Sequence, residues 1–134
     1  MLNAAIDYLL QDTELQQRCG DLLRAKSNFD RAISQATLIL EDRIRKKAKP
    51  ATRLVGENLV GHAFNADLKR TVLKISNDSD DQRGFIFILK GVVPAFRNRT
   101  HHHVTDKFSR GEALRVCGFI DVLLRVVDNS VKVK

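Results

Sequence analysis

The chain has 134 residues, 43% of them hydrophobic and 29% charged, and its 23 Lys and Arg against 16 Asp and Glu give a formal charge of +7. This length suits one domain, 1–134, and the composition excludes a disordered chain. No apolar run approaches the roughly 18 residues of a membrane helix, and the first ten residues lack a basic leader. Cys19 and Cys117 fall within apolar helical patterns, which predicts buried free thiols. We therefore expect a protein of the reducing cytoplasm, away from any membrane.

The first half of the chain shows apolar residues at helical spacing. Residues 2–10 form either a separate opening helix or the first turns of the next one, which Asp12 or Thr13 caps and which runs to about residue 25. Ser27 with Asp30 resembles a capping pair, and the helix that follows should end near residue 47, before Pro50.

The second half continues this pattern after a weaker connection. Thr52 is a candidate cap for a helix ending near residue 64, and the β-prone segment at 70–76 predicts a short strand or an irregular connection. Helical spacing returns in a segment that Pro94 should kink or close, with Phe85, Ile88, Leu89, Val92 and Phe96 at the repeating positions.

The last helix has the clearest start. Ser109 and Glu112 form a capping box, and the apolar pattern ends at residue 128 or 129, leaving a tail at 130–134 that is short enough to fray. Together these segments predict an all-α bundle of four to five helices.

A polar loop between the last two predicted helices holds the residues suited to chemistry. It reads Phe96-Arg97-Asn98-Arg99-Thr100-His101-His102-His103. A solvated loop is the plain alternative, and its internal position excludes an affinity tag. A zinc site is disfavoured, because no Cys-x-x-Cys or His-Glu-x-x-His motif supplies further ligands, so we expect neither a metal nor another cofactor.

The segment from Arg97 to His102 resembles the R-x(4–6)-H signature of HEPN domains, in which a polar residue such as Asn98 often follows the Arg. Further blocks resemble the Ymh-type family of small proteins, which is similar to HEPN domains; they are Leu54-Val55-Gly56, Leu59-Val60, Ala63-Phe64, Arg83-Gly84-Phe85 and Lys90-Gly91. The resemblance covers roughly residues 13–128. Arg99 departs from the Pro that Ymh-type sequences would have there.

This resemblance implies metal-independent RNA cleavage through the ribose 2′-hydroxyl at a site built by two protomers, or nucleotide or RNA binding in inactive relatives. His102 would transfer protons, since imidazole has a pKa near 6.5. Arg97 would stabilise charge on the phosphate oxygens, and Asn98 would orient either group. One His102 would act as base and its copy in a homodimer as acid. Neither Arg97 nor His102 is expected in the core.

Helix geometry constrains which histidine acts. On an unbroken helix Arg97 and His102 would be about 140° apart, whereas His101 would align with Arg97. We expect the helix to end near Arg97, which favours His102, although an extended loop would also bring His103 within reach. Arg99, His101 and His103 are then RNA-binding candidates.

A basic run lies at the end of the third predicted helix and in the linker after it, and consists of Arg43, Arg45, Lys46, Lys47, Lys49 and Arg53. Cations at a helix C-terminus are often solvated surface, but with a charge of +7 the run is equally a candidate phosphate-binding patch. Aromatic residues make up only 6% of the chain, so RNA binding should be largely electrostatic.

The sequence therefore predicts a HEPN-like homodimer that binds RNA and cleaves it, with an antitoxin or sensor as a further partner, because small HEPN proteins are often implicated in toxin or antiviral systems. The competing interpretation is a non-catalytic module that binds a nucleotide or a protein. A DNA-binding helix-turn-helix protein ranks last, since no short turn precedes a basic recognition helix.

Overall fold

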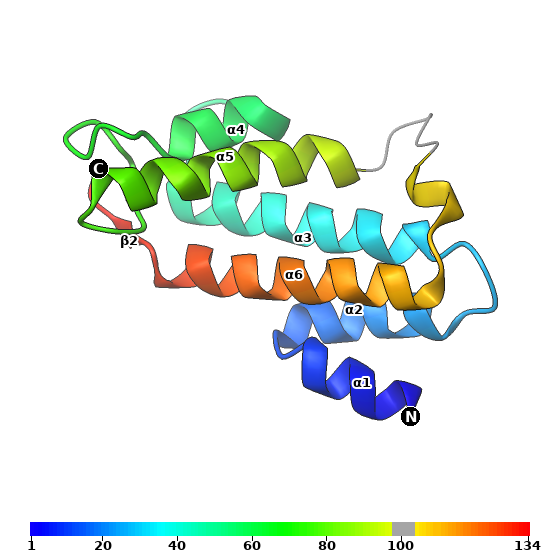
Figure 1. Ribbon diagram of the computed structural model, residues 1–134. Coiled ribbons are helices and arrows are strands. Elements are labelled where there is room, and N and C mark those ends of the chain that lie inside the picture. Colours follow the sequence, from blue (N-terminus) through cyan, green and yellow to red (C-terminus); the bar gives the residue numbers. More distant parts are fainter. Residues whose placement is uncertain (98–103) are drawn as a thin grey trace.

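The computed structural model describes residues 1–97 and 104–134. Within these residues the fold is all-α, with six helices and one two-stranded sheet (Figure 1). The helices are α1 (Leu2–Leu9), α2 (Thr13–Arg24), α3 (Asp30–Ala48), α4 (Gly56–Ala63), α5 (Ser79–Phe96) and α6 (Arg110–Asn129), and a 3₁₀ turn, η1 (Thr105–Lys107), precedes α6. The predicted bundle is confirmed, with one helix more than expected because residues 2–9 form a helix of their own. No described helix has the length and apolar character that crossing a membrane requires.

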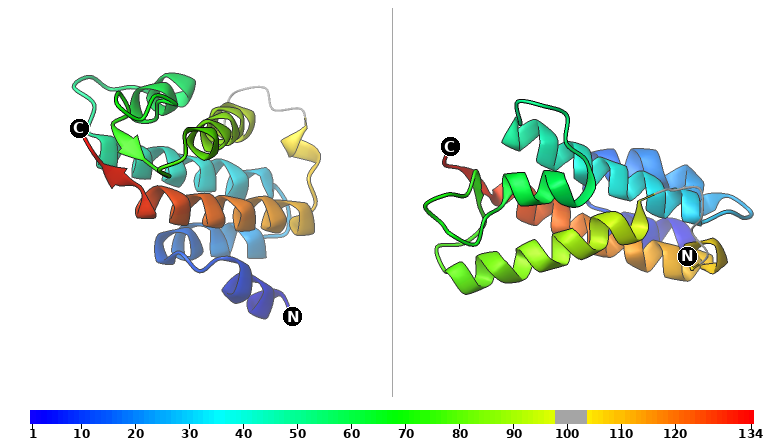
Figure 2. Two further views of the ribbon diagram at one scale, coloured as in Figure 1. Left: turned by 60° about the vertical axis from the view of Figure 1, so that its left-hand side comes forward. Right: turned by 90° about the horizontal axis from the view of Figure 1, so that it is seen from above.

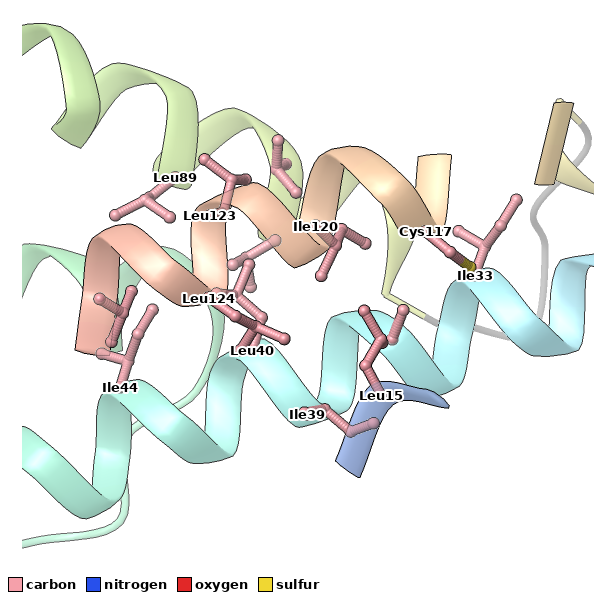
Figure 3. Packing of buried hydrophobic residues seen from close by; sticks show 14 of the residues in the cluster. Leu15, Ile33, Ile39, Leu40, Ile44, Leu89, Cys117, Ile120, Leu123 and Leu124 are labelled. Atoms are coloured by element: carbon pink, nitrogen blue, oxygen red, sulfur yellow. The ribbon is translucent and has the colours of Figure 1, made fainter. Parts of the chain in front are cut away.

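Helix α3 lies at the centre of the bundle. It packs against α2, α4, α5 and α6, while α1 lies on the outside against α2 and α6 (Figures 1 and 2). Helices α3 and α6 run in the same direction, and α5 runs opposite to both. The core between α3 and α6 is formed by buried aliphatic side chains such as Ile33, Leu40 and Leu124, with Cys117 beside Ile33 (Figure 3). Both cysteines are buried and free, as predicted.

The elbow between α1 and α2 is held by two aspartates. Asp12 caps α2, its carboxylate accepting the Leu15 N–H at 3.0 Å. The buried carboxylate of Asp121, on α6, accepts the N–H groups of Gln11 at 3.0 Å and Asp12 at 2.7 Å. These bonds end α1 before α2 begins, so the opening segment is a separate helix.

Two of the predicted helix starts are wrong. Helix α3 begins after Phe29 without a side-chain cap, so Ser27 does not cap it. Helix α4 begins after Val55 rather than near Thr52, and it also lacks a cap from its own N-cap side chain. The predicted end of α3 is confirmed within a residue: Lys49 adopts a left-handed conformation, φ 51°, immediately before Pro50.

The connection from α4 to α5 contains a short strand, which is one of the two predicted alternatives. Strand β1 (Leu73–Lys74) pairs antiparallel with β2 (Val131–Lys132), so the tail forms a strand instead of fraying. Gln82, buried on α5, anchors this connection: its side chain accepts the Ile75 N–H at 2.8 Å and donates to the Leu73 carbonyl at 3.1 Å. A buried amide here replaces the hydrogen bonds that a longer sheet would supply.

Helix α5 includes Pro94 in its last turn and ends two residues later, at Phe96. Its buried apolar residues are Ile86, Leu89, Val92 and Val93. Leu89 and Val92 are therefore buried as predicted, but the buried face is rotated towards Ile86 and Val93, and Ile88 is 39% exposed. Because residues 85–89 are all apolar, periodicity alone does not select which of them face α3. The Ser109–Glu112 capping box and the end of α6 at Asn129 are confirmed.

Candidate functional site

Arg97 marks the point at which α5 stops. It is the C-cap residue, with extended angles of φ −65° and ψ 136°, and its N–H still donates to the Val93 carbonyl at 3.1 Å. Helix α5 therefore ends at Phe96, in agreement with the predicted end near Arg97. The other residues of the motif, Asn98, Arg99 and His101–His103, lie outside the described residues.

The Arg97 side chain points back to the centre of the bundle. Its Nη1 lies 3.6 Å from Oε2 of Glu41, on α3, and the two side chains are 25% and 2% exposed. Arg97 is thus more buried than the sequence predicts. Among the described residues Glu41 is its one ion-pair partner. The pair joins the end of α5 to the middle of the central helix.

Glu41 also binds the start of α4. The same Oε2 accepts the N–H of Gly56 at 2.5 Å. Gly56 has a φ of 59°, which is strained for any residue with a Cβ although the space around it is open. Helix α4 has no cap from its own N-cap residue, and this carboxylate supplies one from another helix, at the end where negative charge is favourable. Glu41 therefore fixes α4 and the end of α5 together.

The geometry leaves Arg97 able to bind an anion. A guanidinium has five N–H donors in a planar fork, and a contact of 3.6 Å to one carboxylate oxygen engages only part of it. A quarter of the side chain remains exposed. The arrangement can therefore hold a cation in a fixed place at the end of a helix, next to the histidine-rich segment in the sequence.

Half of the predicted basic run has partners inside the protein. The Arg43 guanidinium contacts Asp12 at 2.8 Å, Glu14 at 3.0 Å and Asp128 at 3.0 Å. Arg45 donates to the Leu54 carbonyl and to Asp42, and Lys47 donates to the carbonyls of Val127 and Asp128 at the end of α6. Lys46, Lys49 and Arg53 are exposed. RNA binding by the run remains a prediction, and these three residues are the ones free to test it.

Asp12 and Arg43 shift each other's pKa. The hydrogen bond from Arg43 holds the pKa of Asp12 below its ordinary value, and the same bond raises the pKa of Arg43. A hollow of about 210 Å³ beside the pair is lined by Gln11, Asp12, Asp121, Arg125 and Asp128. With three carboxylates around it, this hollow is unsuited to phosphate. In the part of the chain that the structure describes, no three His, Cys, Asp or Glu side chains are arranged to hold a metal.

The sequence did not reveal that Glu41 and Gly56 contribute to the site around Arg97. A signal for Glu41 exists, because it is a single acid on the apolar face of α3 between the buried residues Leu40 and Ile44, where an unpaired charge would be costly. Its partners are set by tertiary contacts with α4 and α5, which no local pattern contains.

A protein-family model matches this chain. The model described as "Protein of unknown function (Hypoth_ymh)" matches residues 10–127, which is most of the chain. No curated protein and no solved structure matches significantly.

Proposed function

This chain belongs to the Hypoth_ymh family, and we propose that it is a HEPN-like RNA-binding protein that cleaves RNA through the ribose 2′-hydroxyl without a metal ion. The proposal rests on the resemblance of Arg97 to His102 to the HEPN signature and on the net charge of +7. A role as a toxin or antiviral effector, with an antitoxin or sensor as partner, belongs to the same proposal.

The observation that supports it best is the position of Arg97. A fully solvated surface arginine does not contact a buried carboxylate. The guanidinium of Arg97, in contrast, lies 3.6 Å from the buried carboxylate of Glu41 at the point where α5 ends. Holding the guanidinium in one orientation reduces the entropy that is lost when it binds a phosphate. The end of the helix also allows the chain to turn, so that His102 need not follow helical geometry.

The chemistry assigns one role to each residue of the motif. His102 takes the proton of the 2′-hydroxyl or delivers one to the leaving 5′-oxygen, because its ordinary pKa lies near neutral pH. Arg97 stabilises the charge that develops on the non-bridging phosphate oxygens. Asn98 orients either group by hydrogen bonding. The products are a 2′,3′-cyclic phosphate and a free 5′-hydroxyl.

A homodimer completes this mechanism. One histidine cannot act as base and acid in the same step, so two protomers that place their Arg97–His102 segments about a two-fold axis would supply both groups. Sedimentation should show a dimer at micromolar concentration, and full activity in a proven monomer would contradict the composite site.

The test incubates purified protein with end-labelled RNA in chelator and analyses the new ends. We expect cyclic-phosphate ends from the wild type, none from His102→Ala or Arg97→Lys, and no cleavage of DNA. Arg97→Lys keeps the positive charge beside Glu41, so it separates the loss of the planar fork from the loss of stability. Arg31→Gln, an exposed α3 position, is the matched control. Strict dependence on a divalent metal would refute the mechanism, and RNA binding without cleavage would favour a non-catalytic module.

A further inference from the structure

A second hollow lies between α4 and the first half of α5. It encloses about 280 Å³ and is lined by Gly61, Phe64, Asn65, Ala66, Arg83, Ile86, Phe87 and Lys90. Phe64 and Ile86 are 2% and 7% exposed and belong to the core, whereas Phe87 is 67% exposed. The hollow therefore has an apolar base and an accessible aromatic ring, with cations at Arg83 and Lys90.

Three residues of this hollow, Arg83, Phe87 and Lys90, belong to a longer line on α5. Arg83, Phe87, Lys90 and Pro94 follow one another at steps of four, three and four residues, which places them on one face of the helix. Arg97 follows three residues later as the C-cap, with its side chain directed towards Glu41. Pro94 lines a neighbouring hollow with Val55, Gly56, Glu57 and Asn58, so the same face borders α4 along its length. At 1.5 Å per residue, successive cations are about 10 Å apart and Phe87 is about 15 Å from Arg97.

The two cations of the hollow are available to a ligand. Neither Arg83 nor Lys90 forms an ion pair with any carboxylate of the described residues, in contrast to Arg43 and Arg45. The end of Lys90 lies over α4, because its Cε and Nζ are both 3.6 Å from where a Cβ of Gly61 would be. The positive charge of Lys90 is thus held across the groove between α4 and α5 that contains this hollow. Along α5, Phe87 lies between Lys90 and Arg83.

This combination has the chemistry of single-stranded nucleic acid binding. A base stacks on an exposed aromatic ring, and cations on either side bind the adjoining phosphates. A lone exposed Phe would need no explanation. Phe87 is exposed between two cations that form no ion pair within the described residues, at the edge of a hollow on the helix that leads to Arg97. This arrangement favours a strand of RNA over an apolar protein segment.

We propose that the groove between α4 and α5 binds single-stranded RNA, with a base stacked on Phe87, phosphates bound by Arg83 and Lys90, and the strand running along α5 to Arg97. The identity of the ligand as RNA rests on the proposed function. The carboxylate of Glu57 lines the neighbouring hollow beside Pro94 and disfavours phosphate there, so the phosphate contacts are assigned to Arg83 and Lys90.

The test measures binding of the full-length chain to a fluorescent single-stranded RNA with 2′-O-methyl riboses, which cannot be cleaved through the 2′-hydroxyl. By anisotropy, Phe87→Ala should weaken binding about 5- to 150-fold, and Phe87→Trp should preserve it. Arg83→Gln with Lys90→Gln should reduce the slope of log K against log salt by about 1.4. Phe119→Ala, an exposed Phe on α6, and Arg31→Gln are the matched controls, and circular dichroism verifies folding.

The outcomes separate this proposal from the proposed function. If the Phe87 and Arg83/Lys90 variants keep the wild-type affinity and salt slope, RNA does not bind in the groove between α4 and α5, even if the protein cleaves RNA. Weakened binding in these variants would support it even if the wild type never cleaves RNA. With cleavable RNA, Phe87→Ala should raise KM and leave kcat unchanged. A shift from dimer to monomer in Phe87→Ala with unchanged RNA affinity would identify an interface between copies and overturn the proposal.

Discussion

Substitution of Arg97 should lower stability as well as activity, because its partner is buried. In Arg97→Gln, the carboxylate of Glu41 keeps its hydrogen bond from Gly56 but loses its cation. Removing one partner of a fully buried pair costs about 3–5 kcal/mol, whereas an exposed pair contributes about 0.2–1 kcal/mol. With one side chain 2% and the other 25% exposed and 3.6 Å between the atoms, we expect a loss of about 1–3 kcal/mol. For a chain of this size the melting temperature should fall by about 3–10 °C.

The assay is a double-mutant cycle in urea, followed by helical circular dichroism. It compares the wild type, Arg97→Gln, Glu41→Gln and the double variant, with Arg31→Gln as the exposed control that should change stability by less than about 0.5 kcal/mol. Glu41→Gln retains an oxygen for the Gly56 N–H, so the cycle isolates the charge interaction. We expect a coupling energy of about 1–2 kcal/mol. Additive effects within about 0.3 kcal/mol would show that the pair contributes nothing and that Arg97 is free to move.

Three further predictions concern other parts of the chain. His101→Gln, His102→Gln and His103→Gln, assayed in parallel for rate against pH, should show the largest loss for His102 together with loss of the limb that titrates near neutral pH; a folded but inactive His101 variant would contradict the assignment. The pKa of Asp12 is lowered by Arg43, so its contribution to stability is present above the ordinary value of 3.8 and disappears as the pH falls through the lowered value. Arg43→Gln should therefore destabilise the protein by about 1–3 kcal/mol at pH 7, and denaturant unfolding should show a smaller loss of stability between about pH 5 and pH 2 than in the wild type. Finally, replacing Lys46, Lys49 and Arg53 with Gln should flatten the salt dependence of RNA binding by about 0.7 per lost phosphate contact without affecting folding, whereas Lys47→Gln should lower the melting temperature; an unchanged slope would make the run plain solvated surface.

The parts of the fold that the sequence predicted are those that local chemistry determines. The capping box at Ser109, the Asp12 cap and the stop before Pro50 each depend on residues within a turn of one another, and all three are found in the structure. The errors at Ser27 and Thr52 have a common cause: a residue with capping chemistry lies near each helix start, but the helix begins after a residue that provides no side-chain cap.

In the candidate site, too, the features set by local sequence were predictable and those set by tertiary contacts were not. Pro94 and the polar residues after it were sufficient to predict that the helix ends near Arg97. The Glu41 contact was not predictable, because it joins residues from three helices that are distant in sequence. Charge runs were equally uninformative on their own: Arg43 and Lys46 look alike in the sequence, yet one is enclosed by carboxylates and the other is exposed.

The elbow at Asp12 has a consequence for how the chain is assembled during synthesis. Its backbone is held by Asp121, which leaves the ribosome more than a hundred residues later, and its carboxylate pairs with Arg43 on the central helix. The first two helices consequently emerge with the turn between them unsecured, and their apolar sides lack the surface of α6. Contacts of such long range are slow to form. The turn between α1 and α2 therefore gains its backbone hydrogen bonds only after α6 has emerged, so this corner of the bundle closes late.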